Sequence, residues 1–192
     1  MNVSEQDARQ SLHLTEEAAH RAHKAVAASY ASDLLILWGF VWLAGYLSLH
    51  FSLEYGGRIF GVLDVLGVIG TFLICRKWPI RNSAAGGGIS STARRIVVLW
   101  VVLFAYAGVW LLLFKPTSAM LVGVFLVTVV MLGYVVTGLW SRGSFIIWLG
   151  LVVTGLALFG YYVIPRYFNL WMAPTGGGAL LGTGLYIHIR WR

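Results

Sequence analysis

Charged residues are scarce in this chain, and their scarcity excludes most classes of soluble protein. Only 11% of the 192 residues are charged, whereas 59% are hydrophobic. A soluble domain is typically about 25% charged and about 45–50% apolar. The mean hydropathy of +0.79 points the same way. We therefore expect a polytopic integral membrane protein, and we exclude a soluble enzyme, a secreted module held by disulfides and a disordered tail.

Cysteine and targeting signals are also nearly absent. Cys75 is the single cysteine, so no disulfide can form within the chain. Residues 1–30 lack an apolar run and contain four acids, which is unlike a signal peptide or a transit peptide. We expect the first hydrophobic run to act as an uncleaved signal anchor.

Six long apolar runs remain, and each approaches the roughly 20 residues that a helix needs to cross the hydrocarbon core. The runs are continuous rather than alternating, which favours helices over strands. We expect an all-α fold, in which a cytoplasmic N-terminal amphipathic helix over residues 1–30 precedes a six-helix transmembrane domain over residues 31–192. The expected spans are 34–51, 59–75, 96–114, 119–140, 145–164 and 168–189, with a flexible cytoplasmic loop over 76–95.

The basic residues indicate an orientation. With the N-terminus in the cytoplasm, the cytoplasmic segments hold 11 of the 14 Lys and Arg residues. Such a bias is typical of cytoplasmic loops. We expect both termini in the cytoplasm and a multi-pass protein of the plasma membrane, by default a bacterial inner membrane. Because the charges serve orientation, we expect the lipid bilayer and no nucleic acid as a partner.

Small residues recur along one face of the N-terminal helix, at spacings of four and three. Such a face lets a partner helix approach closely, so a protein partner or a second copy of the chain is one interpretation. The other is that alanine is simply a good helix former. The face consists of Ala18, Ala22, Ala25, Ser29 and Ser32.

Histidines offer weak metal or cofactor sites. Glu16, His20 and His23 share a helical face, but no clear fourth ligand accompanies them. His50 and His188 are expected at opposite ends of the membrane, too far apart to share one haem. No phosphate-binding, dinucleotide-binding or HExxH motif is present in the sequence. We expect no metal, no cofactor and no catalytic residues.

Two aspartates lie in or beside the predicted spans. Asp33 opens the first span, and an ion pair with Arg94 or Arg95, at the same predicted depth, would account for it. Asp64 lies inside the second span and should not face lipid. We expect it to point into the bundle on a stripe of mostly small or semi-polar residues, namely Gly57, Gly61, Asp64, Val68, Thr71 and Cys75.

The sixth predicted span contains Pro174 followed by a run of glycines, which predicts a broken helix. Asp64 and this break lie at similar predicted depth, and freed backbone N–H groups would suit a carboxylate. We expect an outward-facing polar pocket, with a purely structural link between Asp64 and the break as the alternative. The candidate residues are Asp64, Thr71, Tyr161, Tyr162, Thr175, Gly176, Gly177 and Gly178.

Function is less constrained than fold. The leading hypothesis is a non-enzymatic membrane protein of sensor, accessory or scaffold type, which acts through helix packing and a partner protein. The alternative is a small-solute transporter or a substrate-binding membrane subunit that uses the pocket near Asp64. Too few paired titratable groups are present to favour an embedded enzyme.

Overall fold

The computed structural model describes the backbone of residues 5–52, 54–84, 91–141 and 143–190. Side chains are described for Leu14 and Glu17 and, from residue 28 to residue 190, for all except residues 53, 78–90, 92–93 and 142. The described backbone is helical apart from short connections, and it contains no strand. The expected all-α class is confirmed.

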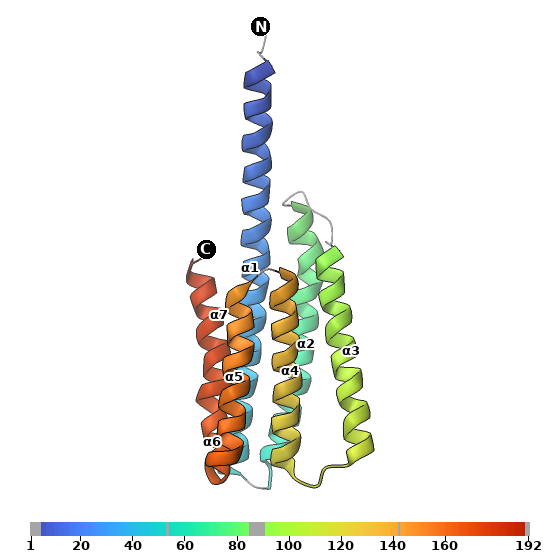
Figure 1. Ribbon diagram of the computed structural model, residues 1–192, viewed down its shortest axis with the longest axis vertical. Coiled ribbons are helices and arrows are strands. Elements are labelled where there is room, and N and C mark those ends of the chain that lie inside the picture. The colour runs from blue at the N-terminus through green and yellow to red at the C-terminus, as the bar shows by residue number, and fades with distance from the viewer. Residues whose placement is uncertain (1–4, 53, 85–90, 142, 191–192) are drawn as a thin grey trace.

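The longest element is α1 (Glu5–Phe51), a single helix of 47 residues. Its second half, Ala28–Phe51, is apolar enough to cross a membrane. The first half continues the same helix and projects beyond the ends of the other helices (Figure 1). No helix-breaking residue separates the two halves, so the backbone hydrogen bonds run through without a turn. The amphipathic character expected of residues 1–30 depends mostly on side chains outside the described residues.

Four further helices are long and apolar enough to cross a membrane, which makes five with α1. They are α2 (Gly56–Ala84), α3 (Ser91–Phe114), α4 (Ala119–Ser141) and α5 (Ser144–Val163). Short connections make consecutive helices antiparallel (Figure 1). The chain is therefore compatible with a multi-pass membrane protein, as expected.

Two helices extend into the predicted loop 76–95. Helix α2 continues to Ala84, and α3 begins at Ser91. The expected loop is thus too long at both ends, because the end of an apolar run marks where a helix leaves the membrane and not where the helix stops. Residues 85–90 lie outside the described part of the chain.

The region of the sixth predicted span is built from several short helical segments. A 3-10 turn, η1 (Pro165–Tyr167), leads into α6 (Phe168–Met172), the π-helix η2 (Ala173–Gly178) and α7 (Ala179–Arg190). Figure 1 shows α7 alongside the other helices, with its C-terminal end on the side from which α1 projects.

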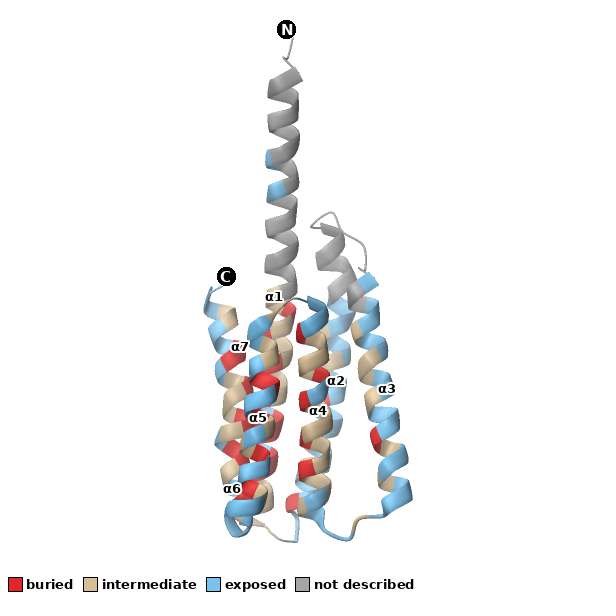
Figure 2. Cartoon of the chain, viewed as in Figure 1, coloured by how far each residue is buried: buried red, intermediate tan, exposed pale blue. Residues whose placement is uncertain are grey.

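The core lies where α1, α4, α5 and the C-terminal segments meet. Its centre is formed by Trp42 and Tyr46 of α1, Met131 of α4, Val153 of α5 and Met172 of α6, all of them buried. Figure 2 shows the buried residues concentrated in these helices, whereas α2 and α3 are mostly exposed. Helix α2 packs mainly on α1, and α3 mainly on α4.

Candidate functional site

The glycine-rich segment Ala173–Gly178 forms a π-helix, so the predicted break is wrong. Pro174 has no amide N–H, and its ring would clash with the carbonyl of residue 170 in a regular α-helix. A wider π turn relieves such a clash while the helix continues. The Thr175 hydroxyl donates to the carbonyl of Trp171 in the preceding α6 at 2.6 Å. The backbone therefore needs no carboxylate to hold it together.

The glycines of this segment serve close packing against α1. A Cβ on Gly177 would lie 2.5 Å from the backbone N of Leu43, and one on Gly176 would lie 3.2 Å from the Trp42 ring. Only glycine fits such an approach of two backbones. The structure thus brings this segment to α1, and α2 is not among its main packing partners in the described residues.

Asp64 lies on the exposed side of α2 rather than inside the bundle. The face of α2 that meets α1 contains Phe60, Gly67 and Gly70, where a Cβ on Gly67 would lie 3.2 Å from Val41 and one on Gly70 2.8 Å from Leu37. On the predicted stripe, Val68 is 59% exposed. A Cβ on Gly57 or on Gly61 would meet nothing within 4 Å. The expectation that this stripe packs within the chain is wrong for all its residues except Thr71, which is half-buried.

One group of the core remains close to Asp64. Tyr46 is buried, and it contacts Phe60, which lies one helical turn before Asp64 on α2. Tyr46 stacks edge-on against Phe60 of α2 and Phe168 of α6, with ring centroids 5.2 and 6.3 Å away. Asp64 therefore sits at the rim of the α1–α2 contact, beside the core but outside it.

The other expected pocket residues make contacts elsewhere. Thr71 accepts a hydrogen bond from the Trp38 indole at 3.0 Å, which joins α2 to α1. Tyr161 is half-buried against the core, and the neighbouring Tyr162 is 76% exposed. In the described structure, Asp64 and Thr175 form no hydrogen bond with each other. The polar pocket around Asp64 stays a prediction.

Asp33 pairs with a different partner from the one expected. Its carboxylate lies 4.0 Å from Nδ1 of His188 on α7. Arg94 and Arg95 start α3 and line a hollow with Trp140 of α4. The predicted ion pair of Asp33 with Arg94 or Arg95 is therefore wrong, because α1 lies against α7 and not against α3.

The small-residue face of α1 packs partly against the chain's own α7. Ser32 is fully buried, and its hydroxyl donates to the carbonyl of Gly184 at 2.9 Å and lies 3.3 Å from Nδ1 of His188. Ser29 is half-buried. The side chains of Ala18, Ala22 and Ala25 lie outside the described residues. The C-terminal end of the face is therefore occupied within the chain.

The described residues contain no group of three or more His, Cys, Asp or Glu that could hold a metal ion. The side chains of Glu16, His20 and His23 lie outside the described part. His50 packs against Phe51 and Tyr167, near the end of α1 opposite to the Asp33–His188 contact.

Two hollows open on the surface. The larger one, about 410 Å³, lies between α3 and α4 and is lined by Arg94, Arg95, Val98, Leu99, Val102 and Trp140. The smaller one, about 260 Å³, lies on α2 and is lined by Tyr55, Arg58, Ile59, Val62 and Leu63. Asp64 and residues 175–178 line neither of these two hollows. Sequence reasoning assigned the arginines to an ion pair and missed the first hollow, although their spacing to Val98 and Leu99 is that of one helical face.

Comparisons with protein-family models, with curated proteins and with solved structures find no match for this chain. The chemistry of its own residues must therefore carry any functional assignment.

Proposed function

We propose that this chain is a non-enzymatic, multi-pass membrane protein of accessory or scaffold type, which docks a partner protein on the projecting part of α1. The length of α1 carries the proposal. Of its 47 residues, the apolar span Ala28–Phe51 uses 24. The other 23 residues, at 1.5 Å each, extend about 35 Å beyond the span.

A single projecting helix has a physical reason to find a partner. Helices without tertiary contacts are only marginally stable in water, because most helical stability in proteins comes from packing. Leu14 lies on this part of α1 and is 58% exposed, so an apolar side chain faces water there. The small residues Ala18, Ala22 and Ala25 follow on the same helix and offer the docking face, upstream of the part that α7 covers.

The membrane topology that we propose has six spans, with both termini in the cytoplasm. The segments α6, η2 and α7 contain 5, 6 and 12 residues, and together they form a helical stretch of about 35 Å, long enough to cross the hydrocarbon core of about 30 Å. Six crossings return the chain to its starting side, in agreement with Figure 1. Arg76, Lys77, Arg94, Arg95 and Arg190 belong to the end from which α1 projects, which favours that end as cytoplasmic. A bacterial inner membrane is the default compartment.

The proposal is tested by photo-crosslinking in cells. A photoreactive amino acid replaces Leu14 on the projecting helix or, as the control, Leu112, which is 75% exposed on the apolar surface of α3. We expect one discrete protein adduct from position 14 and none from position 112. We further expect the adduct to disappear when Ala22 and Ala25 are both replaced by Trp, because bulky side chains keep a partner helix away. The same adducts from both positions, or an adduct that survives the double substitution, would contradict the docking role.

A small-solute transporter is the second candidate, and Asp64 is the observation that favours it. The residue lies eight residues after Gly56, or about 12 Å along α2, and its side chain is exposed on the apolar surface. A carboxylate within the hydrocarbon region costs about 2.5–3.5 kcal/mol at the helix centre, so such groups usually face water, a polar partner or a substrate path. This candidate ranks second because the π-helical glycines, its other support, are occupied by packing against α1.

A further inference from the structure

The first five residues of α3 include two arginines and no acid. The N-terminus of a helix carries partial positive charge and favours anions, so two cations are unfavourable there without a counter-charge. In the described part of the chain, neither Arg94 nor Arg95 forms an ion pair, since the carboxylate of Asp33 lies beside His188 instead. An anionic group from outside the chain would supply such a counter-charge.

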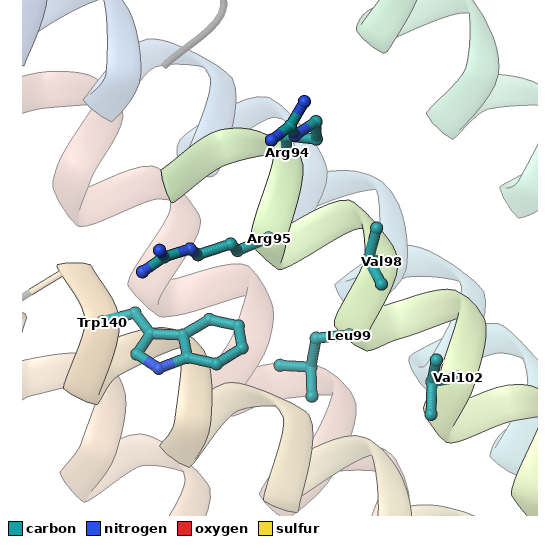
Figure 3. A pocket seen from close by; sticks show the side chains of 6 residues that line it. All are labelled: Arg94, Arg95, Val98, Leu99, Val102 and Trp140. Carbon is teal, nitrogen blue, oxygen red and sulfur yellow. The ribbon is translucent and has the colours of Figure 1, made fainter. Parts of the chain in front are cut away.

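The arginines stand at the head of the hollow between α3 and α4. Figure 3 shows the side chain of Arg95 extending to the side of Trp140, whereas Arg94, one residue earlier on α3, points away from Trp140. The aliphatic residues Val98 and Leu99 lie one helical turn after the two arginines on α3, and Val102 lies one turn after Val98. From Arg94 to Val102 the hollow runs about 12 Å down the helix, from the membrane interface into the apolar region.

The volume and the chemistry of this hollow match one kind of ligand. The hollow of about 410 Å³ is open along the apolar surface, so a ligand in it would stay partly in the bilayer. Guanidinium groups bind phosphate through paired hydrogen bonds, aliphatic side chains accept an acyl chain, and tryptophan prefers the level of the headgroups. Basic pockets between helices at the cytoplasmic surface bind anionic headgroups for the same reasons.

We propose that this hollow binds one anionic phospholipid. Its phosphate is held by the two arginines, and an acyl chain lies along the aliphatic side chains beside Trp140. The lipid completes the contact between α3 and α4, which otherwise rests on Trp100 and Leu103 packed over Gly133, at 3.0 and 3.1 Å from a Cβ built there. Because α3 packs mainly on α4, this lipid strengthens the main attachment of α3 to the bundle.

The test measures thermal unfolding of the full chain in a neutral detergent, with added phosphatidylglycerol, phosphatidylcholine or inorganic phosphate. We expect phosphatidylglycerol to raise the unfolding temperature by about 5 °C or more at saturation, because a ligand of the folded state stabilises it. Phosphatidylcholine and inorganic phosphate should each give less than a quarter of this shift. Added salt should weaken the effect of phosphatidylglycerol.

Three variants locate the effect. In Arg94→Gln/Arg95→Gln the rise in unfolding temperature caused by phosphatidylglycerol should fall at least threefold. Arg76→Gln/Lys77→Gln removes two exposed cations toward the C-terminal end of α2 and should keep this rise. Leu99→Trp fills the hollow, leaves both arginines in place and should also lose the shift, so the test holds if the double arginine variant fails to fold. A rise in unfolding temperature with phosphatidylcholine equal to that with phosphatidylglycerol would show that acyl chains fill the hollow without recognition of the headgroup. A rise with inorganic phosphate equal to that with phosphatidylglycerol would show a site for free anions. An unchanged rise in Arg94→Gln/Arg95→Gln would place the lipid elsewhere. Each of these three results overturns the proposal.

Discussion

Replacement of Gly177 by alanine should destabilise the protein, because this glycine lies against the backbone of another helix. The added Cβ would lie 2.5 Å from the N atom and 2.8 Å from the Cα atom of Leu43. A side chain could rotate away from such a clash, but the backbone in the middle of α1 cannot. The π-helix and α1 must therefore move apart along a contact that includes Trp42 and Gly176.

The expected loss of stability follows from two opposing effects. Overpacking typically costs about 1–3 kcal/mol, and immobile backbone atoms place this site near the upper end of that range. Alanine is more favourable than glycine in a helix by up to about 1 kcal/mol, which offsets part of the cost. We expect a net loss of about 2 kcal/mol. For a chain of this size, that corresponds to a fall of about 4–8 °C in unfolding temperature.

Gly182→Ala is the matched control, since the same methyl group added to the following helix, α7, would meet nothing within 4 Å. Its unfolding temperature should equal or slightly exceed that of the unsubstituted protein. Both variants are measured by thermal unfolding in the same neutral detergent. If Gly177→Ala unfolds at or above the temperature of Gly182→Ala, the close approach of α1 and η2 is not the reason for the glycine.

Two further substitutions probe α1 and α2. Ser32→Ala removes the buried hydroxyl that donates to the Gly184 carbonyl, so the free energy of unfolding should fall by about 1 kcal/mol; Ser29→Ala, whose hydroxyl makes no hydrogen bond in the described structure, should change it by less than half as much. Asp64→Asn keeps the shape of the side chain and removes its charge, so stability should stay equal or rise slightly and cross-linking at position 14 should persist. A fall of more than about 2 kcal/mol for Asp64→Asn would instead indicate a carboxylate held by a buried partner.

Apolar length alone places several helices well. The expected spans 119–140 and 145–164 differ by only one residue at an end from the observed α4 (Ala119–Ser141) and α5 (Ser144–Val163). Continuous apolar runs with short connections leave few alternatives, because every backbone polar group in the membrane must be satisfied within a helix. The same rule could not show where α2 stops, since its helix continues past the apolar run.

The side of each helix that contacts its neighbours could not be predicted from apolar length. In a soluble helix the polar side reveals the buried side, but an apolar helix such as α2 shows similar side chains to lipid and to its neighbours. The sequence offers two small-residue pairs on α2, Gly57 with Gly61 and Gly67 with Gly70, and only the second pair meets α1. Choosing between them requires knowledge of which helix lies beside which.

Helix order in space also decides the partner of Asp33. By depth alone, Arg94 is as good a candidate as His188, and its permanent charge makes it the more attractive one. The structure favours His188 because small residues on α1 and α7 let these two helices approach closely, as at Gly184, where a Cβ would lie 2.9 Å from the backbone N of Ile36. Which polar groups meet in a bundle thus follows from backbone packing, which single residues do not reveal.

The packing of α1 separates the two proposed sites. Close contacts on two sides of this helix, with α2 at Gly67 and with the C-terminal segments at Gly177 and Gly184, fix it at the centre of the molecule. A partner bound to the projecting part of α1 would therefore act on the core directly, through one continuous helix. The hollow at Arg94 and Arg95 lies on α3, which reaches the core mainly through α4, so a lipid there affects an outlying helix first. Loss of lipid binding in the double arginine variant should consequently leave cross-linking at Leu14 intact, and the two proposals succeed or fail independently.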